Sequence, residues 1–300
     1  MRLAPALLAG LLAFPAQAAD DVDEAFAAFQ MGLYLTAFDL ATARAAKGTD
    51  AAAMTLLGEL YTLGLGVPKD PTKAAEWYIK AADLGDREAM VVLAGMELNG
   101  NGTPKDPQRA VLRLGLAAKL KHPQAHYNLG LLHIQGTVVP RDFRKAAEHF
   151  RAAAELGSAD AQYALAAMLK EGRGVTRDVP ASVEWLRKAA AQDNREAMID
   201  LAIAIFNGTG THKDEAAAAR LLKRAAELGN PIAMNRLAKL YAAGRGMPRD
   251  NARAIAWNAV AKALGLTDAA LDEQLAKIPA ADQEAGRRLA AAWHPGAEKP

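Results

Sequence analysis

The sequence predicts an all-α protein, a right-handed solenoid built from antiparallel helix pairs. Three observations predict it: a 36-residue unit written six times without insertion or deletion, glycine and aspartate at fixed places in every copy, and an alanine-rich chain with only 6% aromatic residues. A repeat period of roughly 20 to 50 residues is typical of solenoids, in which each helix pair buries its apolar stripe against its neighbours.

The six copies share invariant positions. They begin at Ala51, Arg87, Pro123, Ala159, Arg195 and Pro231. Within each copy the positions equivalent to Ala53, Leu57, Gly64 and Asp70 hold the same residue six times. Four identical columns at one fixed spacing exclude chance similarity and define the structural unit.

Each copy contains the signals for two helices, A and B. A capping residue such as Asp50 precedes helix A in every copy except the third, where His122 stands. Gly64 is expected to end helix A in the left-handed conformation, and Asp70 to cap helix B with Pro71 in its first turn. The position of Gly58 is glycine or alanine in every copy, which predicts a close helix–helix approach there.

The chain outside the repeats divides into shorter segments. Residues 1–18 have a basic start, an apolar run and an Ala-Gln-Ala site, which is the pattern of a cleaved secretory signal peptide. We expect residues 19–50 to form a degenerate N-terminal helix pair, residues 51–266 the six repeats, residues 267–294 C-terminal capping helices, and residues 295–300 a frayed tail.

The repeat resembles a known family. The first copy reads "AAAMTLLGELYTLGLGVPKDPTKAAEWYIKAADLGD", and its A-x-x-x-L-G-x-x-Y-x-x-G-x-G-V-x-x-D pattern is similar to the Sel1-like repeat, a relative of the tetratricopeptide repeat. Three minor departures from the pattern are Val138, Ser182 and Lys262. The resemblance implies a superhelix that acts as an adaptor, and with the signal peptide it implies an exported, periplasmic bacterial member.

Composition excludes several classes of function. With 36 basic and 34 acidic residues, the chain lacks the excess of positive charge typical of nucleic-acid-binding proteins. It has no cysteine, so no disulfide and no lipid-modified cysteine anchor can form. No stretch after the signal peptide is long enough to span a membrane as an apolar helix.

A search for catalytic or metal-binding motifs gives none. Serine occurs only at 158 and 182, without Ser-x-x-Lys spacing, and the chain has no G-x-S-x-G, H-E-x-x-H or phosphate-binding glycine loop. His126 and His133 share a helix face, but they lie about 10 Å apart along the axis and lack a third ligand at suitable spacing. We therefore predict no catalytic residue, cofactor or metal.

One surface is predicted to bind a partner. By analogy with tetratricopeptide stacks, helix A lines the concave face with the columns of residues 52, 55, 59 and 62. In copies three to five these columns hold large apolar side chains, whereas copies one and six are mostly polar there. The predicted groove residues are Tyr127, Leu131, Ile134, Tyr163, Ile199, Ile203 and Phe206. The alternative is that the curvature of the solenoid buries them between neighbouring A helices.

The leading hypothesis is a non-catalytic periplasmic scaffold that binds a protein or peptide, in envelope assembly, secretion or control of a membrane sensor. One alternative is a protein that binds or hydrolyses the cell wall, which requires convergent titratable groups. Another is a structural subunit of an envelope complex, which requires an interface on the B helices.

Overall fold

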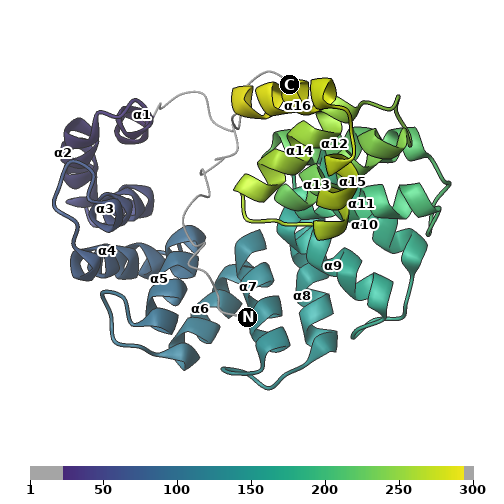
Figure 1. Cartoon of the computed structure of the whole chain (residues 1–300). Helices are drawn as coiled ribbons and strands as arrows, with labels where there is room; N and C mark the ends of the chain where they lie inside the picture. Colours follow the sequence, from purple (N-terminus) through teal and green to yellow (C-terminus); the bar gives the residue numbers. More distant parts are fainter. Residues whose placement is uncertain (1–22, 294–300) are drawn as a thin grey trace. The chain divides into compact units, whose positions relative to one another are not determined.

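The computed structural model describes residues 23–293, which form sixteen helices and no strand. The signal peptide and the tail of the sequence prediction lie outside the described residues. No helix among residues 23–293 is long and apolar enough to cross a membrane. The expected all-α class is confirmed (Figure 1).

Helices A and B of the six repeats are α3 to α14, each of 13 residues. The A helices are α3 (Ala51–Leu63), α5 (Arg87–Asn99), α7 (Pro123–Gln135), α9 (Ala159–Glu171), α11 (Arg195–Asn207) and α13 (Pro231–Ala243). The B helices are α4 (Pro71–Asp83), α6 (Pro107–Lys119), α8 (Phe143–Glu155), α10 (Val179–Ala191), α12 (Glu215–Glu227) and α14 (Asn251–Ala263).

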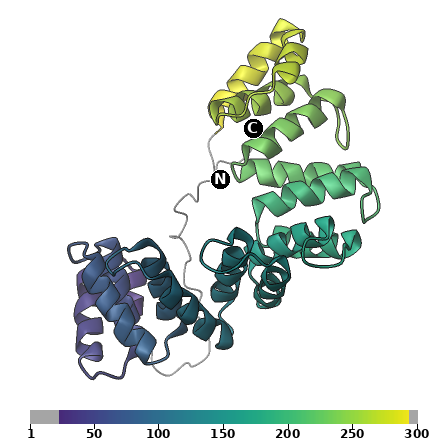
Figure 2. The same ribbon diagram turned by 90° about the horizontal axis from the view of Figure 1, so that it is seen from below.

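The chain forms two compact units, which divide between Asp106 and Pro107 in the loop of the second repeat. The first unit holds α1 (Glu24–Gln30), α2 (Tyr34–Ala45) and α3 to α5. The second unit holds α6 to α14 together with α15 (Ala269–Ala276) and α16 (Ala280–Ala292). Within the second unit, successive helix pairs stack in chain order from teal to yellow (Figure 2).

Helix ends follow the capping pattern. Gly64 ends α3 with φ of 74°, and each equivalent glycine also adopts the left-handed conformation. Asp178 illustrates the start of a B helix: its carboxylate accepts from the N–H of Ala181 at 2.9 Å, and its own N–H donates to Leu169 O of helix α9 at 2.9 Å. One residue therefore caps helix B and ties it to helix A, which makes the turn between them tight.

His122 corrects one sequence expectation. The sequence predicts no cap for helix A of the third copy, but the Nδ1 atom of His122 accepts from the N–H of Ala125 at 3.4 Å. An imidazole nitrogen supplies the acceptor that Asp, Ser or Asn supplies in the other copies. The start of α7 is thus capped like its counterparts.

The small residue in helix A sets the approach of helix B. A Cβ atom at Gly130 would lie 2.6 Å from the ring of Phe150, and one at Gly58 would lie 2.8 Å from Tyr78. Both glycines therefore face an aromatic residue of helix B. Where helix A has alanine instead, helix B has a smaller residue, as in the pairs Ala166–Leu186, Ala202–Leu222 and Ala238–Asn258. The extra methyl group on helix A is therefore accompanied by a smaller side chain on helix B, as close packing requires.

The second loop glycine packs against the preceding repeat. A Cβ atom at Gly174 would lie 2.1 Å from Phe143 O at the start of α8, so only glycine fits at this contact. Equivalent approaches occur at Gly66, Gly102, Gly210 and Gly246. The third copy has Val138 in this column.

The last helix covers the sixth repeat. Gly286 of α16 packs directly on Ile255 of α14, since an added Cβ would lie 2.6 Å from the Ile255 side chain. Trp293 meets the buried Trp257 edge-on, with ring centroids 6.0 Å apart. Leu271 and Leu275 of α15 are also buried. These helices close the exposed end of the stack, as a terminal cap must.

The Gly130–Phe150 contact gives a first prediction. Gly130→Ala should destabilise the protein by about 1–3 kcal/mol, because the ring of Phe150 has no room to move away from the new methyl group. Combining it with Phe150→Leu recreates the alanine–leucine pairs of other copies. The double variant should therefore be more stable than the two single effects predict when added. Urea unfolding of all four proteins measures this coupling, and purely additive effects would contradict it.

Candidate functional site

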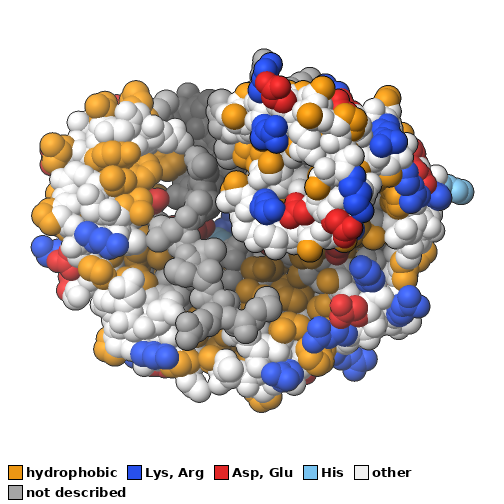
Figure 3. Space-filling view, viewed as in Figure 1, with side chains coloured by type: hydrophobic (Ala, Val, Ile, Leu, Met, Phe, Trp, Pro, Cys, Tyr) orange, Lys and Arg blue, Asp and Glu red, His pale blue; other side chains and the backbone are white. Residues whose placement is uncertain are grey.

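The predicted groove residues all lie in the second unit, on α7, α9 and α11. Tyr127, Leu131 and Ile134 are half-buried and pack against the core formed by α8 and α9. Tyr163, Ile203 and Phe206 are half-buried against the core of the last three repeats. Figure 3 shows hydrophobic side chains gathered in a shaded recess over α7 to α9. These six side chains, here called the row, come from three successive repeats, and part of each is accessible.

The column of residue 55 is the most buried of the predicted inward columns. Thr55, Val91, Ile199 and Asn235 retain 7%, 5%, 6% and 8% exposure. Ile199 therefore belongs to the core and supports the accessible residues of the groove from beneath. The two tyrosines of this column extend further out, and their half-buried rings mark where the column reaches the surface.

Two aromatic residues of the row are held by their neighbours. The ring of Tyr127 lies 5.6 Å from that of the buried Phe150. The guanidinium of Arg245, in the loop of the sixth repeat, lies 4.2 Å from the centre of the Phe206 ring. Such a cation–π contact is worth about 0.5–1 kcal/mol at an exposed site. These contacts fix the orientation of both rings before any partner binds.

Carboxylates lie near the hydroxyl groups of the row. Burial raises the pKa of Tyr163, and Asp200 and Glu196 of α11 raise it further. Burial together with Asp160 raises the pKa of Tyr127. An apolar row with acidic side chains at one edge suits a ligand that carries both apolar and basic groups.

A histidine cluster occupies the third repeat. His126 of α7 and His149 of α8 contact each other through their Nδ1 atoms at 3.1 Å. His133 stacks on His149 with ring centroids 5.9 Å apart and an angle of 12° between the rings. The sequence analysis identified His126 and His133 on one helix and missed His149, which lies on the other helix. Aligning the copies could have revealed it, since His149 stands where three copies have tryptophan.

The histidine cluster favours neutral rings. Burial, together with charge repulsion from His126, His133 and Lys145, lowers the pKa of His149 to about 4. Burial also lowers the pKa of His126. Within residues 23–293, no group of three or more His, Asp or Glu side chains has a geometry that could hold a metal ion.

The repeats match a family model along most of the chain. The description of that model is Sel1 repeat, and it matches residues 51–86, 87–122, 123–158, 159–194, 195–230 and 231–265. This chain belongs to the Sel1 repeat family. Sel1 repeats are typically non-catalytic scaffolds for protein–protein interaction.

Solved structures of Sel1 proteins share the fold. A Sel1 repeat protein from Oxalobacter formigenes is 31% identical over 81% of this chain and 100% of its own length, with a TM-score of 0.75. A protective antigen of uropathogenic Escherichia coli with an SLR fold is 28% identical over 86% of this chain and 63% of its own, with a TM-score of 0.54. Comparison with curated proteins gave no significant match. The solenoid class predicted from the repeat is thereby confirmed.

The histidine cluster of this Sel1 protein predicts a loss of stability in acid. The pKa of His149 falls from 6.5 in a free histidine to about 4 in the folded chain, so the unfolded chain takes up this proton first as the pH drops. The stability that neutral His149 contributes to the folded state is fully present above pH 6.5 and is lost as the pH falls toward 4. After allowance for solvent screening, we expect the free energy of unfolding to fall by about 1–2 kcal/mol over this pH range.

The matched variant is His149→Trp, which installs the residue of copies one, four and six. Chemical unfolding of both proteins at neutral and at mildly acidic pH isolates the histidine contribution from that of other groups. The wild type should lose more stability than the variant on acidification. Equal losses in the two proteins would contradict the assignment.

Proposed function

We propose that this protein is an exported, non-catalytic adaptor that binds a polypeptide segment along the helix-A surfaces of repeats three to five. This proposal rests on the row of half-buried apolar side chains that α7, α9 and α11 present in three successive repeats. In repeats one and six the column of residue 59 holds Glu59 and Lys239 instead. An apolar stretch bordered by polar residues is the composition of a binding surface.

The proposal specifies the chemistry of the segment. Tyr127 and Tyr163 offer ring area and a hydroxyl group, which makes tyrosine frequent among residues that dominate binding energy. Asp160, Glu196 and Asp200 lie close enough to influence these hydroxyls. We therefore propose an apolar segment flanked by Lys or Arg, lying across successive A helices. The proposal assigns no catalytic residue and no cofactor.

The periplasmic location is part of the proposal and rests on residues 1–18. Their basic, apolar and small-residue regions follow one another as in a signal peptide. An exported adaptor of this kind fits envelope assembly, secretion or restraint of a membrane sensor.

Export gives a prediction that does not depend on the groove. Fractionation of the producing bacterium should place the mature protein in the periplasm, and intact-mass measurement should show a chain that begins at Ala19 or Asp20. Full-length protein retained in the cytoplasm, with residues 1–18 present, would contradict the proposed export.

The groove is tested by site-specific crosslinking. A photoreactive amino acid in place of Ile203 should capture a partner in the periplasm, whereas the same group in place of Leu112, which is 69% exposed on α6, should not. The captured partner is then purified and its affinity measured. Capture of the same partner only from the Leu112 position would place the surface elsewhere.

Alanine variants separate binding from folding. Tyr163→Ala and Ile203→Ala should each weaken partner binding by about 1–3 kcal/mol, because each removes accessible apolar area from the row. Leu129→Ala in the core should instead cost roughly 2–5 kcal/mol of stability. Leu112→Ala is the exposed control and should change neither quantity. If Tyr163→Ala unfolds the protein as severely as Leu129→Ala, the row is core and the groove assignment fails.

A further inference from the structure

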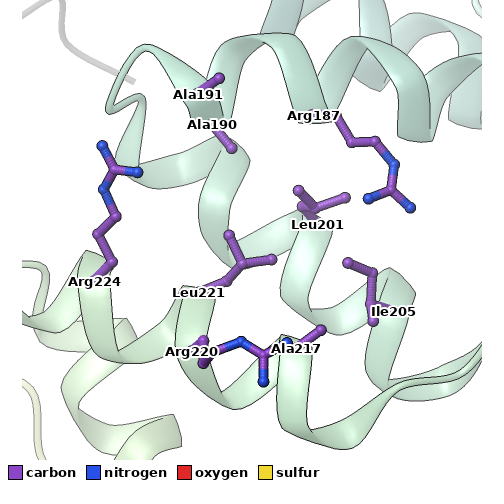
Figure 4. Close-up of a pocket in the computed structure, with 9 residues that line it drawn as sticks. All are labelled: Arg187, Ala190, Ala191, Leu201, Ile205, Ala217, Arg220, Leu221 and Arg224. Atoms are coloured by element: carbon purple, nitrogen blue, oxygen red, sulfur yellow. The ribbon is translucent and has the colours of Figure 1, made fainter.

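A hollow of about 470 Å³ opens in the second unit between α10 and α12. Its apolar surface comes from residues of α10, α11 and α12, and three arginines surround it (Figure 4). The apolar lining residues are Ala190, Ala191, Leu201, Ile205, Ala217 and Leu221. The hollow is separate from the proposed groove: Leu201 and Ile205 lie on the opposite side of α11 from Ile203, about 200° around the helix.

The hollow lies at a position where three other repeats have a large ring and the fifth does not. Leu221 stands in the column that holds Trp77, Trp185 and Trp257 in copies one, four and six. In two of those copies a lysine one turn further along the same helix covers the indole. The Lys80 nitrogen lies 4.1 Å from the Trp77 ring centre, and the Lys188 nitrogen lies 3.9 Å from that of Trp185. A cation resting on an aromatic ring is thus a recurrent contact of this repeat.

The fifth repeat keeps the cation of this contact and lacks the ring. Arg224 occupies the column of Lys80 and Lys188, with Leu221 in the ring position. Figure 4 shows Leu221 in the middle of the lining residues, with Arg224 to its left and Arg220 below it. A guanidinium stacks on an aromatic face at least as readily as an ammonium does. The space and the cation together match an aromatic ring supplied from outside.

The charges around the hollow favour an acidic neighbour for that ring. Arg224 pairs with Asp193 at 2.5 Å, and Arg187 bonds the Thr211 hydroxyl at 3.0 Å and pairs with Glu184 at 3.4 Å. Arg220 forms no ion pair with any residue that the structure describes. Two of the three arginines are thus paired with carboxylates outside the hollow, and Arg220 supplies the one positive charge of the lining that has no such pair among the described residues.

We propose that this hollow binds an aromatic side chain of a partner polypeptide, with a neighbouring carboxylate of the partner on Arg220. The ring fills the space that tryptophan fills in other copies and lies beside the Arg224 guanidinium. A single deep aromatic residue with a charged neighbour is a common anchor in protein interfaces. The site is independent of the groove on α7, α9 and α11 and requires a ligand of opposite charge.

The test uses defined peptides as probes. The first is acetyl-Asp-Trp-Asp-amide, and the comparison peptides replace its tryptophan by alanine or its aspartates by lysine. Binding is followed by NMR of methyl-labelled protein, in which the Leu221, Leu201 and Ile205 methyl groups report on the hollow. The acidic tryptophan peptide should shift these signals. Both comparison peptides should bind more weakly, because each lacks one of the two recognised groups.

Leu221→Trp is the decisive variant, because it restores the residue of copies one, four and six and should leave the fold intact. It should weaken binding of the acidic tryptophan peptide by about tenfold or more. Ala217→Met fills the hollow from a second position and serves if the first variant does not fold. Arg220→Ala should also weaken binding, whereas Arg236→Ala, on an exposed arginine of α13, is the matched control and should not.

Three results with the peptides would overturn the proposal. They are unchanged peptide binding in folded Leu221→Trp or Ala217→Met protein, equal binding of the alanine peptide, and no shift of the hollow methyl groups by the acidic tryptophan peptide. Sedimentation with phosphatidylglycerol vesicles tests whether a lipid surface occupies the hollow instead. If the protein binds these vesicles through the hollow and the peptide does not compete, the occupant is a lipid surface and the polypeptide assignment is wrong.

Discussion

The close contact between helix A and helix B within a repeat is the constraint on which the rest of the fold depends. Gly130 against Phe150 and Gly58 against Tyr78 leave no space for a further carbon atom. Copies with alanine in helix A have a smaller residue in helix B, so the larger residue on one helix is matched by a smaller one on the other. Since the third to sixth repeats stack on one another within the second unit, an error in this spacing would be passed to the neighbouring repeats.

The loop between helices A and B holds the two helices in the position that this contact requires. The left-handed glycine stops helix A, and the aspartate that caps helix B also bonds a carbonyl of helix A through its own N–H, as Asp178 does to Leu169. The second glycine, as at Gly174, brings the loop against the start of the preceding B helix. Capping, turn and stacking therefore depend on only a few side chains, which leaves the remaining positions free to differ between copies.

The repeats differ from one another at those remaining positions. The third repeat has three histidines where other copies have methionine, tyrosine and tryptophan among other residues, and they contact one another instead of forming an apolar cluster. The fifth repeat has Leu221 in a column that is tryptophan in three copies, and Leu221 lines a hollow. The apolar row on α7, α9 and α11 is a third such departure. An interaction scaffold acquires its own partners through differences of this kind, while the shared positions preserve the helix pairs.

The sequence by itself determined the helices, their ends and their order, because these depend on local signals: the capping aspartates, the glycines and the three- to four-residue spacing of apolar positions. It also determined the small residue at Gly130, because the same column was small in six copies. Only the tertiary structure decided which side chains share a surface. His149 lies 23 residues from His126 along the chain, yet the two rings touch. Ile199 was expected on an open surface, but it retains only 6% exposure because the neighbouring elements cover it. Contacts and burial of this kind depend on the packing of separate helices, which no local pattern specifies.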